Sequence, residues 1–178
     1  MTSRHDLELR KFLAPEFVHG PGALALAGRY VRNLGAEHAL IVTDPGVVAT
    51  GWVGKVRESL DEAGIADTVF DGVSPNPRDA EVMAGAQRYR EAGCDALVAV
   101  GGGSPMDCAK GIGIVVANGR PIRDFEGVDQ VAEPMPLTLC VPTTGGTSAD
   151  VSQFAIVTRP EQRRKIAIIS KAVVPDVA

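Results

Sequence analysis

The sequence predicts a Rossmann-like α/β fold, in which an open parallel sheet carries helices on both faces. Short apolar runs alternate with segments whose apolar residues recur at helical spacing, at intervals of about 25 residues. The run 95–100 (DALVAV) is apolar almost throughout, as expected of a strand buried on both faces of a parallel sheet. Regular alternation of this kind indicates βαβ units, whose crossover helices cover such a sheet.

The first half of the chain carries two strand signals, and a helix signal follows the first of them. The run 38–43 (HALIVT) is apolar and β-branched, and it stops at 44–46 (DPG), which is a turn sequence. Apolar residues recur at helical spacing over 51–63, and Gly64 marks the end of that helix. The other elements expected here are a short strand over 67–70, a helix over 22–34 and an extra edge strand or hairpin arm over 7–17.

The second half repeats the pattern. In the run 74–77 (SPNP), Asn76 suits a helix N-cap and Pro77 suits the first helical position. The apolar face of that helix is expected to consist of Val82, Met83, Ala86 and Tyr89, with Gly93 closing the helix. The elements expected after it are a strand over 95–100, a helix after the glycines 101–103, a long loop over 119–136, a strand over 137–141, and strands over 152–158 and 165–170 around a turn at 159–161.

Composition favours a single globular domain over residues 1–178. The chain is 45% hydrophobic and 22% charged, and its net charge of −4 gives no electrostatic reason to expect nucleic acid or an anionic membrane as a partner. No apolar run approaches the roughly 20 residues that span a bilayer, and charged residues near the N-terminus argue against a signal peptide. The three cysteines form no CxxC pair and are expected to be buried thiols. We expect a cytoplasmic protein.

The strongest chemical signal is the glycine loop, residues 101–103, directly after the apolar strand. Three glycines let the backbone turn sharply and let a ligand approach without a Cβ in the way. Ser104 is expected as the N-cap of the next helix, Pro105 as its first residue and Asp107 as the partner in a capping box. Free N–H groups at a helix start bind phosphate or pyrophosphate. The alternative is a turn that only packs tightly.

Two further polar features follow strands. The GxGxxG fingerprint is absent after 38–43, where Asp44 instead suits the ribose hydroxyls of a nucleotide and would repel the extra phosphate of NADP. Alternatively, Asp44 only starts a turn before Pro45. The polar cluster 142–150 (PTTGGTSAD) places hydroxyls and glycines at the same sheet edge. There, Thr147 or Ser148 with Asp150 could simply cap a helix.

No metal site is expected from the histidines. His5, His19 and His38 lie 14 and 19 residues apart, which is not the close helical spacing of a metal-binding pair. We expect them to be surface or structural residues.

These motifs together resemble the iron-containing, or group III, alcohol dehydrogenases. The resemblance rests on 42–44 (VTD), 74–77 (SPNP), 101–110 (GGGSPMDCAK) and 142–158 (PTTGGTSADVSQFAIVT), which cover nearly the whole chain in order and spacing. It implies the NAD(H)-binding domain of a metal-dependent enzyme that transfers hydride between a primary alcohol or aldehyde and NAD. The resemblance implies that cofactor-binding residues lie within these motifs and at one lysine after them, namely Asp44, Asn76, Gly101, Gly102, Gly103, Ser104, Asp107, Thr143, Thr144, Thr147 and Lys165.

The resemblance also implies roles for these residues. Asp44 would meet the adenosine ribose, and the glycine loop with Ser104 would bind the pyrophosphate. Asp107 would support that loop or face the nicotinamide side. The three threonines would line the nucleotide groove, and Lys165 would reach the cofactor.

The chain departs from the family pattern in two places. Family members usually have TAGTGSE where residues 144–150 read TGGTSAD, a variant similar to a subgroup of alcohol-dehydrogenase-like regulatory proteins. Members also carry a helical C-terminal domain that supplies one Asp and three His to the metal, and this chain stops at Ala178, before that domain. We therefore expect a truncated member, whose Fe²⁺ or Zn²⁺ is bound only in the full-length protein.

Three functional hypotheses follow. The first is the nucleotide domain of a dehydrogenase, inactive without its partner domain and prone to self-association as a homodimer or higher oligomer. The second is a nucleotide-sensing regulatory protein that kept the fold and lost turnover. The third is a phosphosugar or polyol-phosphate binder that uses the same glycine loop.

Overall fold

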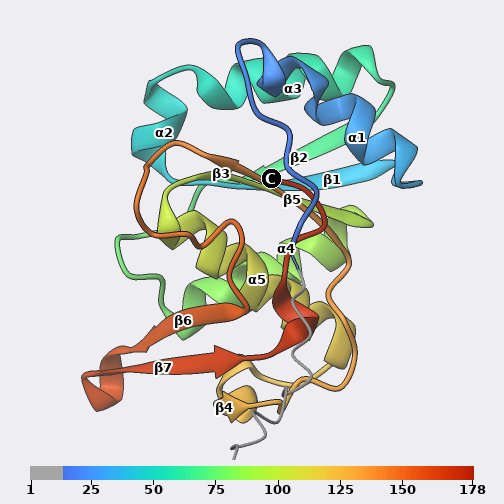
Figure 1. Cartoon of the computed structure of the whole chain (residues 1–178). Helices are drawn as coiled ribbons and strands as arrows, with labels where there is room; N and C mark the ends of the chain where they lie inside the picture. The colour runs from blue at the N-terminus through green and yellow to red at the C-terminus, as the bar shows by residue number, and fades with distance from the viewer. Residues whose placement is uncertain (1–13) are drawn as a thin grey trace, which may run out of the picture.

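The structure, a computed structural model, describes residues 14–178, which are built around a four-stranded parallel sheet (Figure 1). The strands lie in the order β2-β1-β3-β5, and all three pairings are parallel. The predicted fold class is therefore confirmed. The strands of this sheet are β1 (His38–Val42), β2 (Ala66–Phe70), β3 (Ala96–Gly101) and β5 (Leu137–Pro142).

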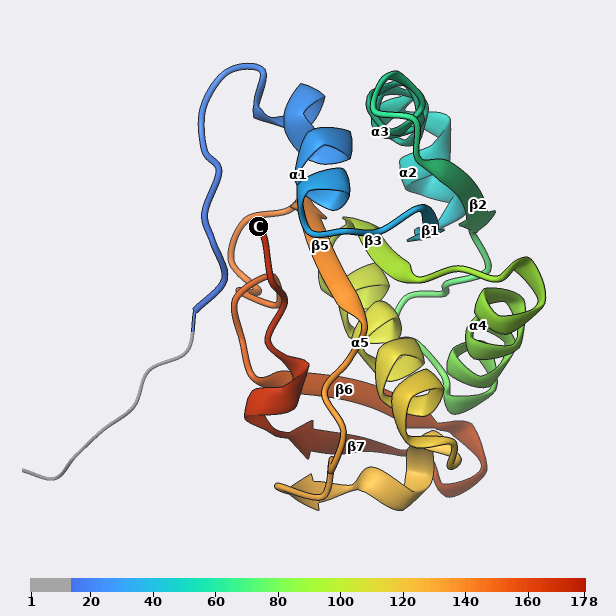
Figure 2. The ribbon, with the colours of Figure 1, turned by 90° about the vertical axis from the view of Figure 1, so that its right-hand side faces the viewer.

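Helices cover both faces of the sheet, as Figure 2 shows from the side. Neighbouring residues of a strand point to opposite faces, so Leu40 and Leu97 join the core on one side while Ile41 and Val98 join the core on the other. Both cores demand apolar side chains, which is why the inner strands are apolar throughout. The helices are α1 (Ala27–Asn33) and α3 (Trp52–Glu62) on one face, and α4 (Asp79–Ala92) and α5 (Gly103–Asn118) on the other.

A second, three-stranded sheet packs beneath α5 in the order β4-β7-β6. β6 and β7 pair antiparallel with Thr158 opposite Lys165, and their alternate residues Ala155, Val157 and Ile166 belong to the same core as α5. This hairpin confirms the two predicted C-terminal strands. The elements are β4 (Gly127–Val128), β6 (Phe154–Arg159) and β7 (Arg164–Ile169), with the 3-10 helices η1 (Ala23–Leu26), η2 (Ile122–Phe125), η3 (Pro160–Gln162) and η4 (Lys171–Val173).

Both ends of the described chain extend the sheet beyond β5. The amide of Cys140 donates to the carbonyl of Val177 at 2.9 Å, and the amide of Glu16 donates to the carbonyl of Asp176 at 2.8 Å. The edge strand predicted over 7–17 lies outside the described residues up to position 13. Of the remainder, Glu16 forms a parallel bridge with Val177.

Two segments that were expected to be a turn and a loop contain regular secondary structure. The predicted turn at 44–46 is the start of a short helix, α2 (Pro45–Ala49), for which Asp44 is the N-cap. A proline at the first helical position is compatible with a helix as well as with a turn. The predicted loop over 119–136 contains η2 and β4, because Ile122 and Phe125 are fully buried under α4 and α5.

The start and face of α4 also differ from the prediction. Asn76 is not an N-cap, since the helix begins at Asp79 with Arg78 as its N-cap. Asn76 instead has a left-handed backbone with φ 59°, and both prolines of the run 74–77 precede the helix. Met83 was expected on the buried face of the helix but is exposed. Gly85 is buried there instead, beside Val82 and Ala86.

The helix predicted over 22–34 is divided into the 3-10 helix η1 and the shorter helix α1. Cys94, Cys108 and Cys140 are buried free thiols, as predicted. Over residues 14–178, no helix combines the length and apolar character needed to cross a membrane.

Candidate functional site

The glycine loop joins the carboxyl end of β3 to the first turn of α5. Gly101 is the last residue of β3, and Gly102 rather than Ser104 is the N-cap of α5, so the predicted cap is wrong. The carbonyl of Gly102 accepts from the Met106 amide at 3.4 Å. The helix therefore starts two residues earlier than predicted. Its first N–H groups, which have no intrahelical acceptor, lie at the glycine loop and at Ser104 directly after it.

The loop lies against the polar cluster 142–150. The Thr143 amide donates to the carbonyl of Gly101 at 2.9 Å. A Cβ added to Gly102 would lie 3.2 Å from the Thr144 hydroxyl oxygen, and one added to Gly103 would lie 3.3 Å from the Thr147 methyl group. The two motifs therefore form one surface at the carboxyl edge of the sheet, the edge at which such folds bind ligands.

A groove of about 420 Å³ opens beside this surface, between the first turn of α5 and the β6–β7 hairpin. We call it the α5 groove. It brings together six of the predicted cofactor-binding residues from four separate segments, namely Asn76, Gly103, Ser104, Asp107, Thr147 and Lys165.

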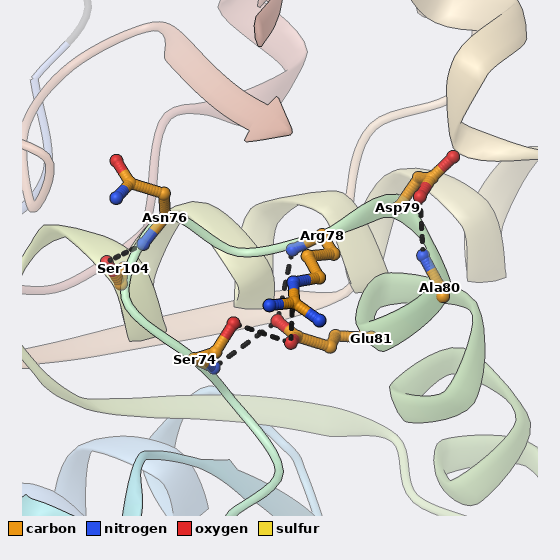
Figure 3. Close-up of polar contacts among 7 residues, drawn as sticks. All are labelled: Ser74, Asn76, Arg78, Asp79, Ala80, Glu81 and Ser104. Carbon is orange, nitrogen blue, oxygen red and sulfur yellow. Dashed lines mark hydrogen bonds and ion pairs between the residues drawn. The ribbon is translucent and has the colours of Figure 1, made fainter. Parts of the chain in front are cut away.

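Contacts across the groove connect its walls. The Asn76 amide donates to the Ser104 hydroxyl at 3.1 Å, as Figure 3 shows, and the Asn76 side-chain oxygen accepts from the Lys165 ammonium at 2.6 Å. Ser104 thus acts as an acceptor for the 74–77 loop instead of capping its own helix. The ammonium of Lys165 is held at the groove by a neutral partner, which leaves its charge free to meet an anion.

Asp107 lies in the same groove, three residues along α5 from Ser104. Burial raises the pKa of Asp107 to about 6. The nearby ammonium groups of Lys110 and Lys165 lower this pKa, but their effect is smaller than that of burial. The predicted capping box with Ser104 is absent, because Ser104 is not the cap. Asp107 instead supplies a partly buried carboxyl group to the groove.

Lys110 is a site-shaping residue that sequence reasoning missed. Its side chain is fully buried, and burial lowers its pKa. The ammonium donates to the carbonyl and hydroxyl of Ser152 at 2.6 and 3.2 Å, and to the carbonyl of Phe154 at 2.9 Å. All three of its donors are satisfied, so Lys110 ties the start of β6 to α5.

One wall of the groove was also missed. Phe154, Ile156 and Thr158 alternate along β6 and therefore share one face of it. Phe154 and Ile156 remain 41% and 38% exposed, while the Thr158 hydroxyl oxygen is buried and has no hydrogen-bond partner within residues 14–178. Their alternation in the sequence could have predicted that these three residues share one face of the strand. It could not have predicted that this face lines the groove.

The other predicted residues lie along the sheet edge outside the α5 groove. Asp44 follows β1, and its side chain accepts from the Val47 amide at 3.0 Å as the N-cap of α2. Thr143 lines a second cavity of about 450 Å³ together with Tyr30 and Trp52. Thr144 and Thr147 are exposed and cap no helix, because the chain runs from them into β6.

The histidines lie apart from one another. His38 begins β1 at the amino end of the sheet, and its Nε2 contacts the Thr68 hydroxyl at 3.0 Å. His19 lines the second cavity, and His5 lies outside the described residues. Within 14–178, no three His, Cys, Asp or Glu side chains come together in a way that could hold a metal ion.

Comparison with known proteins gives consistent matches. A sequence model for iron-containing alcohol dehydrogenases matches residues 14–178. Alcohol dehydrogenase 4 of Schizosaccharomyces pombe is 39% identical over 175 residues, which cover 98% of this chain and 42% of that protein. The NAD-dependent methanol dehydrogenase of Bacillus methanolicus is 37% identical over 94% of this chain and 44% of its own length.

Solved structures agree. A crystal structure of 1,3-propanediol oxidoreductase matches with a TM-score of 0.92 and 38% identity, over 96% of this chain and 45% of that one. An alcohol dehydrogenase from Oenococcus oeni matches with a TM-score of 0.91 and 31% identity. The chain thus spans less than half the length of these relatives.

Proposed function

The chain belongs to the iron-containing alcohol dehydrogenase family, and we propose that it binds NAD(H) along the carboxyl edge of its sheet. In the whole protein, this cofactor would exchange hydride with a primary alcohol or aldehyde. The observation that carries the proposal is the convergence of the glycine loop, Asn76 and Lys165 on one groove. A relative named as an NAD-dependent methanol dehydrogenase supports it.

The first turn of α5 suits the pyrophosphate. Gly102 and Gly103 present backbone without side chains, and the N–H groups of a helix start point at such an anion. Lys165 adds a positive charge that Asn76 orients from the opposite wall. A dinucleotide that crosses the glycine loop would then extend one half into the α5 groove and the other toward Asp44.

The β6 wall suits the reacting half of the cofactor. Phe154 and Ile156 offer exposed apolar surface beside the Asp107 carboxyl group. Apolar side chains exclude water from a nicotinamide ring and hold one face of it open to a substrate. The residues of this chain would therefore bind and orient the cofactor.

The metal that the family name implies does not fit the described residues. A bound Fe²⁺ or Zn²⁺ would polarise the oxygen of the alcohol, yet residues 14–178 assemble no ligand group for it. We place the metal ligands in the part of the relatives' length that this chain does not cover.

Asp44 should make the protein prefer NAD over NADP. Its carboxylate would lie near the 2′ position of the adenosine ribose, where a phosphate would be repelled. Asp44→Asn removes the charge but keeps an N-cap side chain of similar quality for α2. The ratio of NAD to NADP affinity is expected to fall about tenfold, as for the loss of one screened charge pair.

Isothermal titration calorimetry with NAD, NADP and a sugar phosphate tests both the binding of NAD and the preference for NAD over NADP. Asp44→Gly should reduce the difference between NAD and NADP affinity in the same way, while also weakening the N-cap of α2. Tighter binding of NADP than NAD by the parent would contradict the assignment of Asp44. Preference for the sugar phosphate over either dinucleotide would instead support the third hypothesis.

The 178-residue chain alone is expected to reduce no NAD with a short primary alcohol, even with added Fe²⁺ or Zn²⁺. Hydride leaves an alcohol readily only when its oxygen is polarised, and a catalytic metal needs about three protein ligands. The described histidines, His19 and His38, are held at a separate cavity and at the amino end of the sheet. Metal-dependent formation of NADH, followed by absorbance, would refute this expectation.

A further inference from the structure

Glu81, in the first turn of α4, holds both ends of the loop 74–78. One of its carboxylate oxygens, Oε2, accepts from the amides of Ser74 at 3.3 Å and Arg78 at 3.0 Å. The other, Oε1, accepts from the Ser74 hydroxyl at 2.6 Å, and all of these contacts are visible in Figure 3. The bond to Arg78 is an ordinary helix cap, but the two bonds to Ser74 reach beyond the helix.

The loop has few other means of keeping its shape. Pro75 and Pro77 have no amide hydrogen, so Ser74, Asn76 and Arg78 are its only backbone donors. Two of these three donate to Glu81, and the third donates to the Ser104 hydroxyl. Asn76 also has a left-handed backbone, which costs free energy for a residue with a side chain and persists only where surrounding contacts impose it.

The loop in turn connects the walls of the α5 groove. Asn76 contacts Ser104 on α5 and Lys165 on β7, and the carbonyl of Pro77 accepts from the Thr158 amide of β6 at 2.7 Å. Glu81 itself does not line the groove. Its side chain is 17% exposed and lies on the far side of the loop from the groove residues.

We propose that Glu81 is a positioning residue, which sets Asn76 against Ser104 and Lys165 and so controls binding of the half of the dinucleotide that enters the α5 groove. The proposal rests on the proposed binding of NAD(H). It separates two parts of the nucleotide site: Glu81 governs the groove side, while the adenosine side near Asp44 is independent of it.

The test compares the affinities of NAD and AMP in the parent and in Glu81→Ala. AMP carries only the adenosine half, so its affinity should stay within about twofold, while that of NAD should fall about tenfold after loss of hydrogen bonds to a charged group. Glu81→Gln should restore NAD binding, because its amide oxygen accepts the two N–H groups and its amide nitrogen donates to the Ser74 hydroxyl. Glu91→Ala, on the same helix and bonded only to Gln87 among the described side chains, is the matched control with unchanged affinity.

A double-mutant cycle with Asn76→Ala decides whether Glu81 acts through Asn76. Asn76→Ala removes the side-chain contact with Lys165 but keeps the backbone amide that donates to Ser104. In this background, Glu81→Ala should therefore cause a clearly smaller loss of NAD affinity than in the parent. If Glu81→Ala does not fold, Ser74→Ala replaces it in the cycle, with an expected loss of about threefold from removal of one hydrogen bond.

The outcomes separate the two proposals. Equal losses for AMP and NAD, full additivity with Asn76→Ala, or unchanged NAD affinity in Glu81→Ala would each overturn the role of Glu81 while NAD binding by the parent stands. A parent that binds no NAD would overturn the proposed function and this role with it.

Discussion

Gly102→Val is expected to lower the affinity for NAD by about a hundredfold or more, the largest binding effect of any single change considered for this protein. The branched side chain would stand where the pyrophosphate must approach the N–H groups of α5. Its Cβ would already lie 3.2 Å from the Thr144 hydroxyl oxygen, so the rest of the side chain is directed into the space between the loop and the polar cluster.

Gly102 is the best of the three glycines for this experiment because the substitution should leave the fold intact. Its φ of −86° is accessible to any residue. Gly101, in contrast, has φ 149°, and a Cβ there would lie 2.6 Å from the Pro105 ring. Loss of binding in a Gly101 variant would therefore confuse misfolding with blocked access.

Calorimetric titration of NAD into Gly102→Val gives the measurement, with circular dichroism to verify the fold. Gly54→Val serves as control, since Gly54 is exposed on α3 and a Cβ there has nothing within 4 Å. The control should bind NAD like the parent. Equal affinities of the parent and Gly102→Val would mean that the pyrophosphate does not bind at the glycine loop.

Gly28→Ala is expected to cause the largest loss of stability, about 3 kcal/mol in the free energy of unfolding, at the upper end of overpacking effects. A Cβ on Gly28 would lie 1.9 Å from the carbonyl oxygen of Ser59 and 2.9 Å from the Cα of Leu60. Both are backbone atoms, so they can yield only if α1 and α3 move apart. That movement would also break the bond from the Gly28 amide to the Ser59 hydroxyl, which is 3.0 Å long.

Thermal and urea denaturation measure the effect. The midpoint temperature should fall by roughly 6–12 °C for a domain of this size. Gly54→Ala is the matched control: it adds the same methyl group to an open helical position and should stabilise by about 0.5–1 kcal/mol through helix propensity. A Gly28→Ala protein as stable as the parent would contradict the tight contact between the two helices.

The order and type of the main elements could be predicted because each depends on a local pattern. A parallel strand buried on both faces must be apolar throughout, so β1 and β3 stand out in any reading of the sequence. The glycine loop could likewise be recognised from the local sequence, because only residues without a Cβ leave the backbone accessible at a helix start. The resemblance of the motifs to the dehydrogenase family follows from the same short segments.

Helix boundaries were predicted less well, because a proline or a capping residue satisfies more than one local arrangement. Ser104 has a good N-cap side chain, yet α5 begins at the glycines and Ser104 accepts from Asn76 instead. Asn76 and Pro77 form a helix-start sequence, yet α4 begins at Asp79. The Asn76 amide donates to Ser104 and the Pro77 carbonyl accepts from Thr158, and these contacts hold both residues in the loop.

What only the tertiary structure decided is which of these residues meet. Lys165 and Asn76 are 89 positions apart, and their contact exists because the β6–β7 hairpin folds back under α5. The buried ammonium of Lys110 is tied to β6 for the same reason. A sequence pattern records which side of each element is buried, since burial selects for apolar side chains along that element. Contacts between polar side chains on different elements produce no periodic pattern in the sequence, because they depend on how the layers pack.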